Sequence, residues 1–499
     1  MISAELHDRR TWLELACLLT GVAVIFLLQF AISPMYDADS YLHIRMAEFL
    51  RLHGVVHAFP WARFTLFNEH FSDKDFLFHL MLVPFTYAHN IFAGGKLAAA
   101  LLFAGLYAAY YLFLRAWGAR SLIPLFLLAF FLCPLFVLNL LCTRPFAPIL
   151  CFALLAIWLM IGRRAIAVAV LTLVYALTHL SAPYMLIFLA FVEGARYLSE
   201  RTVCRRNLWG VLAGTVLGML VHPYFPDNLA VFWQNGVMVP VYAMQGGVLE
   251  LGGEFFPMNT RDALFRLAPA WAGFFGIMAF SIFSRQRPVL TLPTRVLFVF
   301  SLFYLVMGFV SQRSFNHGWL PFLLFFAAYL RDVTVTAPLA GRRLLLVYGA
   351  GVLLLGGYGV YVAREVRAAM GGFSAVNGHY ETMGAFMRQQ IPKGELIFTA
   401  NWSDPQYFIG IDPDHYYFVT LDPVYMYSFD RTKYALYRDI AFGRCADPAQ
   451  ALWQGFGCRY GYIGKTYRAG LLDQVRCDPR FQILREDEYG LLFALRPPA

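Results

Sequence analysis

Long apolar segments alternate with short polar connections over most of the chain. Between residues 13 and 362 these segments are about 15 to 23 residues long, close to the roughly 20 residues that a helix needs to cross a hydrocarbon core. We count about eleven of them, which predicts a polytopic bundle of transmembrane helices over residues 1–362. The segments at 166–176 and 183–191 are short, and we expect them to be tilted or buried within the bundle.

The pattern changes after residue 362. Charged residues return, and short β-like runs such as "ELIFTA", "HYYFVTL" and "YGLLFAL" are separated by Pro, Gly and Asp turns, with helix-like stretches between them. This pattern predicts a soluble α/β domain over residues 363–499. The domain contains Cys445, Cys458 and Cys477, so an oxidising compartment would allow one disulfide and leave one thiol free.

Composition agrees with a membrane protein and argues against a soluble one. Hydrophobic residues make up 59% of the 499 positions, charged residues make up 14%, and the mean hydropathy is +0.56. The basic residues behind the net charge of +9 fall in several short loops and not on one face, so no nucleic-acid partner is expected. If these loops are cytoplasmic, so is the N-terminus, and the C-terminal domain lies outside. We expect an inner-membrane protein with a periplasmic C-terminal domain.

One apolar segment does not fit this topology as a membrane span. The stretch "FLFHLMLVPFTYAHN" has no basic flank, and counting it as a span would invert every later loop. We therefore expect an interfacial or re-entrant helix inside a long first external loop, residues 34–90.

Under this topology, acids, histidines and arginines gather at the outer ends of the spans. They are Asp37, Asp39, His43, Arg45, Asp73, Asp75, His79, Arg144, His179, His222, Glu250, Glu254, Arg313 and His317. Charge at a membrane edge is costly and usually marks a functional site. A transporter needs a path open to both sides, with polar groups near the midplane. The one-sided distribution favours an enzyme that acts at the outer leaflet on a substrate with a lipid tail.

The order of these features resembles the C-type glycosyltransferase (GT-C) superfamily, and within it the oligosaccharyltransferase catalytic subunits. Those enzymes open their first external loop with a pattern similar to D-P-Y-Y-H-x-R, which "DADSYLHIR" matches at Asp39, Tyr41, His43 and Arg45. The resemblance implies a GT-C-like membrane domain of about eleven helices with a C-terminal outer domain. It also implies an inverting transfer of a sugar or oligosaccharide from a polyprenyl-linked phosphate donor to a protein, lipid or glycan acceptor.

Three further pieces of the chain fit this resemblance. Arg144 in "LCTRPF" matches an Arg in the next short external loop, and "GGVLELGGEFF" offers Glu250 or Glu254 for the functional Glu of a mobile loop. Trp402 and Asp404 in "NWSDPQYF" match the spacing of a Trp-Trp-Asp-Tyr-Gly motif, although the residues after each of them depart from it. That departure argues against a pocket for a peptide sequon.

The family's metal ligands are matched only in part. Its second loop carries a pair of acids after the Arg, whereas "RPFAPILCF" has none. Asp37 and Asp39 alone make a weak cage for Mg²⁺ or Mn²⁺, unless Asp73 and Asp75 complete it. A metal-free branch of the superfamily uses polyprenyl-monophosphate sugars and needs only an Asp base, so both chemistries stay open.

The resemblance implies a role for each candidate residue. Asp37 or Asp39 is the expected base, Glu250 assists catalysis, and the expected substrate-binding residues are His43, Arg45, Arg144, Arg313, His317, Trp402 and Asp404. Each also has a simpler explanation: an Asp commonly caps a helix, and an Arg at this depth reaches lipid headgroups. No glycine-rich phosphate loop is present, so no nucleotide cofactor is expected. The alternatives are a lipid or glycan transporter, or a non-catalytic component of envelope polysaccharide assembly.

Overall fold

The computed structural model describes residues 2–283, 288–336, 341–466 and 468–496. The contacts divide the chain into two compact units that alternate along the sequence. We call them the helical unit (Met1–Ile32, Lys96–Gly218 and Gly252–Met370) and the mixed unit (Ser33–Gly95, Met219–Leu251 and Gly371–Ala499).

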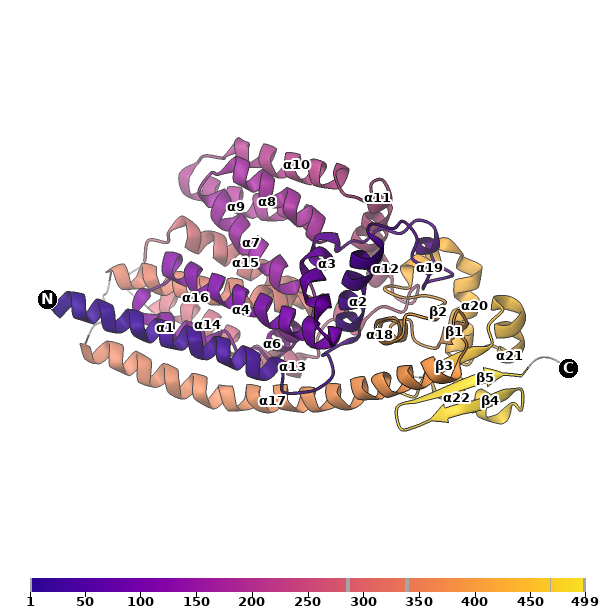
Figure 1. Cartoon of the computed structure of the whole chain (residues 1–499). Helices are drawn as coiled ribbons and strands as arrows, with labels where there is room; N and C mark the ends of the chain where they lie inside the picture. The colour runs from indigo at the N-terminus through magenta and orange to yellow at the C-terminus, as the bar shows by residue number, and fades with distance from the viewer. Residues whose placement is uncertain (1, 284–287, 337–340, 467, 497–499) are drawn as a thin grey trace. The chain divides into compact units, whose positions relative to one another are not determined.

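The helical unit is built from apolar helices (Figure 1). Its elements are α1 (Ile2–Gln29), α4 (Ile91–Trp117), α5 (Ile123–Ala129), α6 (Pro134–Leu141), α7 (Phe146–Ile161), α8 (Ala165–Thr178), α9 (Met185–Glu200), α10 (Arg205–Leu220), α13 (Thr260–Arg266), α14 (Ala268–Phe283), α15 (Leu292–Gly308), α16 (Arg313–Thr336) and the first part of α17 (Gly341–Gln390). Helices α4, α10 and α17 continue across a boundary between the units.

Four described helices are long and apolar enough to cross a membrane, or up to six if each bent pair counts as one span. The bent pairs turn by 73° between Ala129 and Pro134 and by 75° at Leu267. Other apolar helices, such as α7, α8 and α15, have 14 to 17 residues. The protein is therefore a helical membrane protein, and the count of about eleven spans stays a prediction.

Aromatic side chains fill the interior of the helical unit. Phe130 contacts the rings of Tyr107, Tyr110 and Phe136 at centroid distances of 4.8 to 5.2 Å. The Trp319 indole N–H donates to the Phe130 carbonyl at 3.0 Å, which satisfies a polar group inside the apolar bundle. Such contacts replace the hydrophobic driving force that helices lack inside a bilayer.

The mixed unit contains a five-stranded sheet in the order β2-β1-β3-β5-β4 (Figure 1). Strand β1 (Leu396–Thr399) runs parallel to β2 (Tyr416–Tyr417) and β3 (Tyr460–Gly464), whereas β5 (Gly490–Leu495) is antiparallel to β3 and to β4 (Phe481–Glu486). The parallel pairs need helical crossovers. This sheet confirms the α/β class predicted for the C-terminal region.

Along the sequence, helices precede and separate the strands of this sheet. They are the end of α17, α18 (Asp404–Ile411), α19 (Val424–Phe429), α20 (Arg431–Ala441), α21 (Pro448–Gln450) and α22 (Ala469–Cys477). The three cysteines of this region are free thiols in the structure, and the Cys458 thiol donates to the Leu396 carbonyl at 3.2 Å.

The first loop of the chain is part of the same unit. It contains α2 (Ala38–His53), α3 (Phe76–Leu82) and a 3₁₀ segment, Val83–Tyr87. Together α3 and this segment cover 12 residues, roughly 18 Å at 1.5 Å per residue, which is short of a hydrocarbon core. This length agrees with a helix that does not span the membrane.

The loop extends the sheet at the edge of β2. Tyr417 donates its N–H to the Trp61 carbonyl at 2.7 Å, and its own carbonyl accepts from Arg63 at 2.8 Å. Phe64 N–H donates to the Phe418 carbonyl at 3.0 Å. The backbone from 61 to 64 therefore pairs with an edge that would otherwise expose free donors and acceptors.

Helix α2 is fixed against α18 by two residues of the "DADSYLHIR" motif. The Arg45 guanidinium donates to the Gly410 carbonyl at 2.7 and 2.9 Å. A Cβ added at Gly410 would lie 2.5 Å from the Tyr41 Cβ and 2.7 Å from the Tyr41 backbone, so α2 approaches α18 closely only because residue 410 is glycine. The Tyr41 hydroxyl donates to Glu381 of α17 at 2.7 Å.

This close approach makes Gly410→Ala a test of the packing. We expect the variant to lose about 1 to 3 kcal/mol of stability, because α2 and α18 must move apart to admit the methyl group. The measurement is thermal unfolding of the full-length protein in detergent. Gly378→Ala is the matched control, because Gly378 is a helical glycine of the same unit whose added Cβ would meet nothing within 4 Å, and Ala favours a helix over Gly. Equal stability of the two variants would contradict this account of Gly410.

Candidate active site

The two acids that open the first loop have different positions at the start of α2. Asp37 is the N-cap residue, with extended backbone, and its Oδ1 accepts from the Ser40 N–H at 2.9 Å and from the Ser40 hydroxyl. A short acceptor side chain at this position satisfies a backbone N–H that the helix leaves open. Asp39 lies in the first turn, one turn before His43 on the same face. The capping role of Asp37 is therefore seen directly, and its predicted catalytic role stays a prediction.

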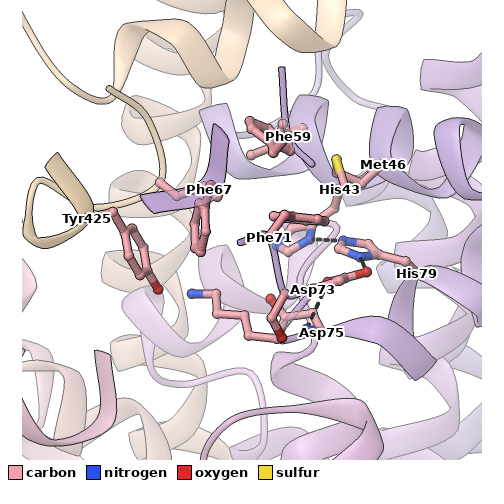
Figure 2. Close-up of a pocket in the computed structure, with 13 residues that line it drawn as sticks. His43, Met46, Phe59, Phe67, Phe71, Asp73, Asp75, His79 and Tyr425 are labelled. Carbon is pink, nitrogen blue, oxygen red and sulfur yellow. Dashed lines mark hydrogen bonds and ion pairs between the residues drawn. The ribbon is translucent and has the colours of Figure 1, made fainter. Parts of the chain in front are cut away.

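A buried hydrogen-bonded chain connects α2 to the start of α3 (Figure 2). His43 Nδ1 lies 2.7 Å from His79 Nε2, and His79 Nδ1 lies 2.6 Å from Asp73 Oδ2. Asp73 Oδ1 accepts from the Asp75 N–H at 3.0 Å, which forms the turn that leads into α3. We call Asp39, His43, Asp73, Asp75 and His79 the acid–histidine cluster.

Burial changes the protonation of this cluster. Asp73, Asp75 and His79 are each at most 5% exposed. Burial raises the pKa of Asp75 to about 6, with Lys74 and His79 opposing the rise and the charges of Asp73 and Asp39 adding to it. Burial is the largest single influence on the pKa of His79 and lowers it, but the charge and hydrogen bond of Asp73, together with the charge of Asp75, offset burial and leave that pKa raised. Such shifts favour proton transfer near neutral pH.

The cluster borders a small cavity with apolar and aromatic walls (Figure 2). The cavity has a volume of about 30 Å³, and its lining residues are Leu42, His43, Met46, Phe59, Phe67, Phe71, Ser72, Asp73, Lys74, Asp75, His79, Leu421 and Tyr425. The rings of Phe67 and Tyr425 contact each other at a tilt of 38°, with centroids 4.0 Å apart. Leu421 has a φ of 70°, a strained conformation for a branched side chain and one found often at functional sites.

Residues of the loop 219–251 border the same region. The ring of Tyr224 lies 5.6 Å from that of Phe71, and the ring of His222 lies 6.0 Å from that of Phe76. Burial lowers the pKa of His222, and the nearby charge of Asp73 opposes this shift. His222 is therefore a neutral neighbour of the cluster around pH 7.

Glu250 lies elsewhere in the mixed unit, against the C-terminal domain. Its carboxylate pairs with the buried guanidinium of Arg468, and its backbone N–H donates to the Tyr434 hydroxyl at 3.3 Å. Arg438 donates to the Gly247 carbonyl at 3.1 Å. In this conformation Glu250 anchors its loop, and no described contact joins it to the acid–histidine cluster.

Asp404 is an interior residue of the mixed unit. It is 2% exposed, and its Oδ1 accepts from the Tyr380 hydroxyl at 2.7 Å. Burial raises the pKa of Asp404 to about 7, although the Tyr380 hydrogen bond and the charge of Arg468 oppose the rise. Trp402, two residues earlier, is partly exposed. Their predicted substrate-binding roles stay predictions.

The other predicted site residues belong to the helical unit. Arg313 begins α16 and forms an ion pair of 3.3 Å with Glu254, with both side chains nearly half exposed. One turn later, the partly exposed ring of His317 contacts the Phe146 ring at 5.2 Å, and Phe146 follows Arg144 by two residues. Arg144, Arg313 and His317 thus come from neighbouring helix ends of this unit.

Sequence reasoning recognised the motif at α2 but missed the partner of its histidine. Asp73 was expected either to complete a metal site with Asp75 or to begin a capped interfacial helix, His79 was only counted among the outer ionisable groups, and neither was paired with His43. The available signal was the spacing in "SDKDFLFH", where an Asp before a helix start precedes a His one turn into that helix. The contact with His43 depends on how α2 packs on α3, which local sequence does not specify.

Comparison with known proteins gives a fold but no sequence family. No protein-family model matches the chain. No curated protein matches it by sequence. Among solved structures, the apo oligosaccharyltransferase of Archaeoglobus fulgidus aligns with 90% of this chain and 69% of its own, with a TM-score of 0.64 and 10% identity. ArnT from Cupriavidus metallidurans, bound to undecaprenyl phosphate, aligns with 96% of this chain and 97% of its own, with a TM-score of 0.57 and 13% identity.

The mycobacterial arabinofuranosyltransferase AftD also aligns, over 96% of this chain and 41% of its own, with a TM-score of 0.50 and 16% identity. These three proteins are GT-C glycosyltransferases. The chain has the GT-C fold. As the resemblance at "DADSYLHIR" implied, the chain contains apolar membrane helices, a long first loop and a C-terminal region with a small sheet. Fold similarity at this level of identity leaves the reaction to be argued from the site.

Proposed function

We propose that the protein is a membrane glycosyltransferase that moves a sugar or oligosaccharide from a polyprenyl-linked phosphate donor to an acceptor, on the periplasmic side of an inner membrane. The observation that carries this proposal is the acid–histidine cluster at the start of the first loop, in a chain with the GT-C fold. Structures of ArnT with undecaprenyl phosphate and of the archaeal oligosaccharyltransferase AglB with a dolichol-phosphate support a donor of this class.

Asp39 is the general base in this proposal. It lies in the first turn of α2 on the face of His43, and its charge reaches the buried Asp75 carboxyl. The carboxylate takes the proton of the acceptor as the acceptor atom attacks the anomeric carbon. The bond from that carbon to the phosphate oxygen breaks, and its electron pair stays with the phosphate. One displacement of this kind inverts the anomeric centre, whereas retention would need a second carboxylate as nucleophile.

Arginines of the helical unit are the proposed partners of the leaving phosphate. Arg313 and Arg144 carry permanent charges near the ends of apolar helices, and a guanidinium matches the geometry of a phosphate. Arg313 pairs with Glu254 across an exposed contact, which costs little to break. In this proposal the donor phosphate replaces Glu254 as the partner of Arg313.

The residues proposed for a metal ion fit it poorly. Asp37 uses its carboxylate to cap α2, and its Ser40 contacts occupy one oxygen. Among the residues that the structure describes, no group of three or more His, Cys, Asp or Glu side chains is arranged to hold a metal ion. A divalent cation prefers six or more oxygen ligands or an octahedral set. We therefore derive no step through a metal.

Chelation tests this point. We expect sugar transfer by the full-length protein in proteoliposomes to continue at an unchanged rate after treatment with EDTA, because the base and the phosphate partners are side chains. The measurement compares initial rates before and after chelation. Loss of transfer that Mg²⁺ or Mn²⁺ restores would contradict the metal-free route and indicate an oligosaccharyltransferase-like metal site.

The glycosyltransferase proposal itself is tested in cells. Mass spectrometry would compare polyprenyl-linked sugars and surface glycoconjugates in the source organism with the wild-type gene, without it, and with Asp39→Asn. The proposal predicts that one glycan is absent from the acceptor and that its lipid-linked form accumulates, in both the deletion and the variant. Identical glycans and lipids in all three strains would contradict it.

A further inference from the structure

We infer that Asp73 and His79 are positioning residues for His43, and that the three form a relay that carries away the proton which the acceptor gives to Asp39. The inference rests on the proposed glycosyltransferase reaction and adds residues to its site. It comes from the two short hydrogen bonds that join α2 to α3 inside a buried part of the first loop.

The hydrogen-bond chain has only one arrangement of protons that fits an ionised Asp73 and a neutral His79. A carboxylate only accepts, so His79 donates to it through Nδ1–H. Nε2 of a neutral His79 then accepts, and His43 donates to it through Nδ1–H. This tautomer turns the basic nitrogen of His43, Nε2, into the acceptor end of the chain. Asp73 thus sets the tautomer of a ring that it does not touch.

The relay step balances in protons. Asp39, once protonated by the acceptor, donates its O–H to His43 Nε2 and becomes a carboxylate again. His43 passes its Nδ1–H to His79 Nε2, so that His79 becomes an imidazolium held against the Asp73 carboxylate. The proton later returns from His79 Nε2 to His43 Nδ1, and His43 gives up its Nε2–H to the released phosphate or to water, so the chain returns to its first state. No bond other than these N–H and O–H bonds changes.

The surroundings favour a positive charge at the end of the chain. Three acids face this region: Asp73 and Asp75 from the turn before α3, and Asp39 from α2. Lys74 opposes them, and the further titratable neighbours are His222, Tyr224 and Tyr425. Burial lowers the pKa of His79, but Asp73 and Asp75 together offset burial, and the net effect is a raised pKa. An imidazolium between carboxylates is stabilised as a proton reservoir.

Burial separates the His79–Asp73 end of this relay from bulk water, whereas His43 is partly exposed. His79 and Asp73 are at most 5% exposed, and the rings of His43 and Phe78 pack edge to face with centroids 5.3 Å apart. A fixed chain of hydrogen bonds that begins on the same face of α2 as Asp39 gives the proton a ready acceptor and keeps the reorganisation of the site small.

Asp73→Asn tests the relay with little change of shape. The amide oxygen can still accept from the Asp75 N–H, so the turn before α3 is kept, but the amide nitrogen now faces His79 Nδ1 as a donor. His79 must then take the other tautomer and can no longer accept from His43. We expect the rate at saturating donor to fall by about tenfold, with the donor concentration for half-maximal rate unchanged.

The pH profile separates a relay from a structural role. A relay that is already protonated cannot accept a proton, so the wild-type rate falls as the pH drops through the raised pKa of His79. Asp73→Asn removes the charge that raises this pKa, so the acid limb moves to lower pH. The probe is a polyprenyl-linked lipid extract of the source membranes in proteoliposomes with the full-length protein, and the readout is released polyprenyl phosphate.

Two variants keep the test decisive. His79→Gln should lower the same rate by a similar factor, and Asp73→Asn combined with His79→Gln should cost no more than either change alone, since both interrupt one chain. His70→Gln, at an exposed histidine of the same loop, is the matched control and should keep the wild-type rate and profile. If Asp73→Asn does not fold, the rate and pH profile of His79→Gln decide whether the relay exists.

The outcomes distinguish the relay from the function on which it rests. If Asp39→Asn abolishes release while both Asp73→Asn and His79→Gln keep the wild-type rate and acid limb, the relay is wrong and the glycosyltransferase proposal stands. If Asp39→Asn also leaves release unchanged, the proposed site fails as a whole. A lower rate with an unshifted acid limb would reduce Asp73 and His79 to structural residues, and would overturn the relay.

Discussion

Asp39→Asn should lower the rate of sugar transfer by at least about 10²-fold, the usual contribution of a positioned general base. The change removes the basic group but keeps nearly the same volume, and Asp39 is not the residue whose side chain caps α2. Folding and donor binding should therefore survive. The measurement is the initial rate at saturating lipid-linked donor with the full-length protein in proteoliposomes.

The control for this prediction is Asp473→Asn, an exposed carboxylate on α22 that should leave the rate unchanged. Asp37→Asn is informative beside it, because Asn caps a helix about as well as Asp, so any loss of rate reflects chemistry and not helix stability. A normal rate for both Asp39→Asn and Asp37→Asn would leave the first loop without a base. A structural or transport role would then be the better account of the chain.

Arg313→Ala should weaken binding of the lipid-linked donor by about 10- to 100-fold, corresponding to the roughly 1.5 to 3 kcal/mol of a hydrogen bond to a charged group. In the structure Arg313 pairs with Glu254 at 3.3 Å, and both are nearly half exposed, so the pair itself contributes little. Two measurements as a function of donor concentration would report binding: the initial rate of transfer, and the amount of donor that the protein retains at equilibrium.

Glu254→Gln is the matched counterpart. If the donor phosphate replaces Glu254 as the partner of Arg313, removing the Glu254 charge should leave donor affinity equal or tighter, and should reduce its dependence on salt. Weakening by both variants would indicate that the ion pair matters as a structural link. Unchanged affinity in Arg313→Ala would reduce Arg313 to a residue that reaches lipid headgroups.

The fold could be predicted where local composition decides it. Helices α1 and α4 are apolar over 20 residues or more, and the short β-like runs quoted after residue 362 contain β1, β2 and β5. The bend before Pro134 was not predictable in this way, because it interrupts a segment that reads as a continuous apolar run. Apolar length therefore predicts a membrane helix better than it predicts where that helix ends.

The site shows a similar limit. Asp39 and His43 were identified because they share a short motif, and spacing of four residues places both on one face of a helix. The same motif also contains Tyr41 and Arg45, whose hydrogen bonds to Glu381 and Gly410 hold α2 against α17 and α18. Asp73 and His79 could be recognised as site residues only through the contact of His79 with His43, which lies 36 residues earlier in the sequence. Tertiary packing brings these two side chains together.

The pairing of the first loop with β2 also constrains how the chain can be assembled. The Trp61 indole donates to the Pro413 carbonyl across a sequence separation of 352 residues, and the backbone from 61 to 64 completes its ladder only with Tyr417 and Phe418. During synthesis the loop is complete long before its partner strand exists, so these donors and acceptors wait unpaired while most of the helices are made. Contacts of such large sequence separation form late and slowly. The acid–histidine cluster therefore acquires its final surroundings only near the end of translation, and an incomplete chain carries the motif without the site.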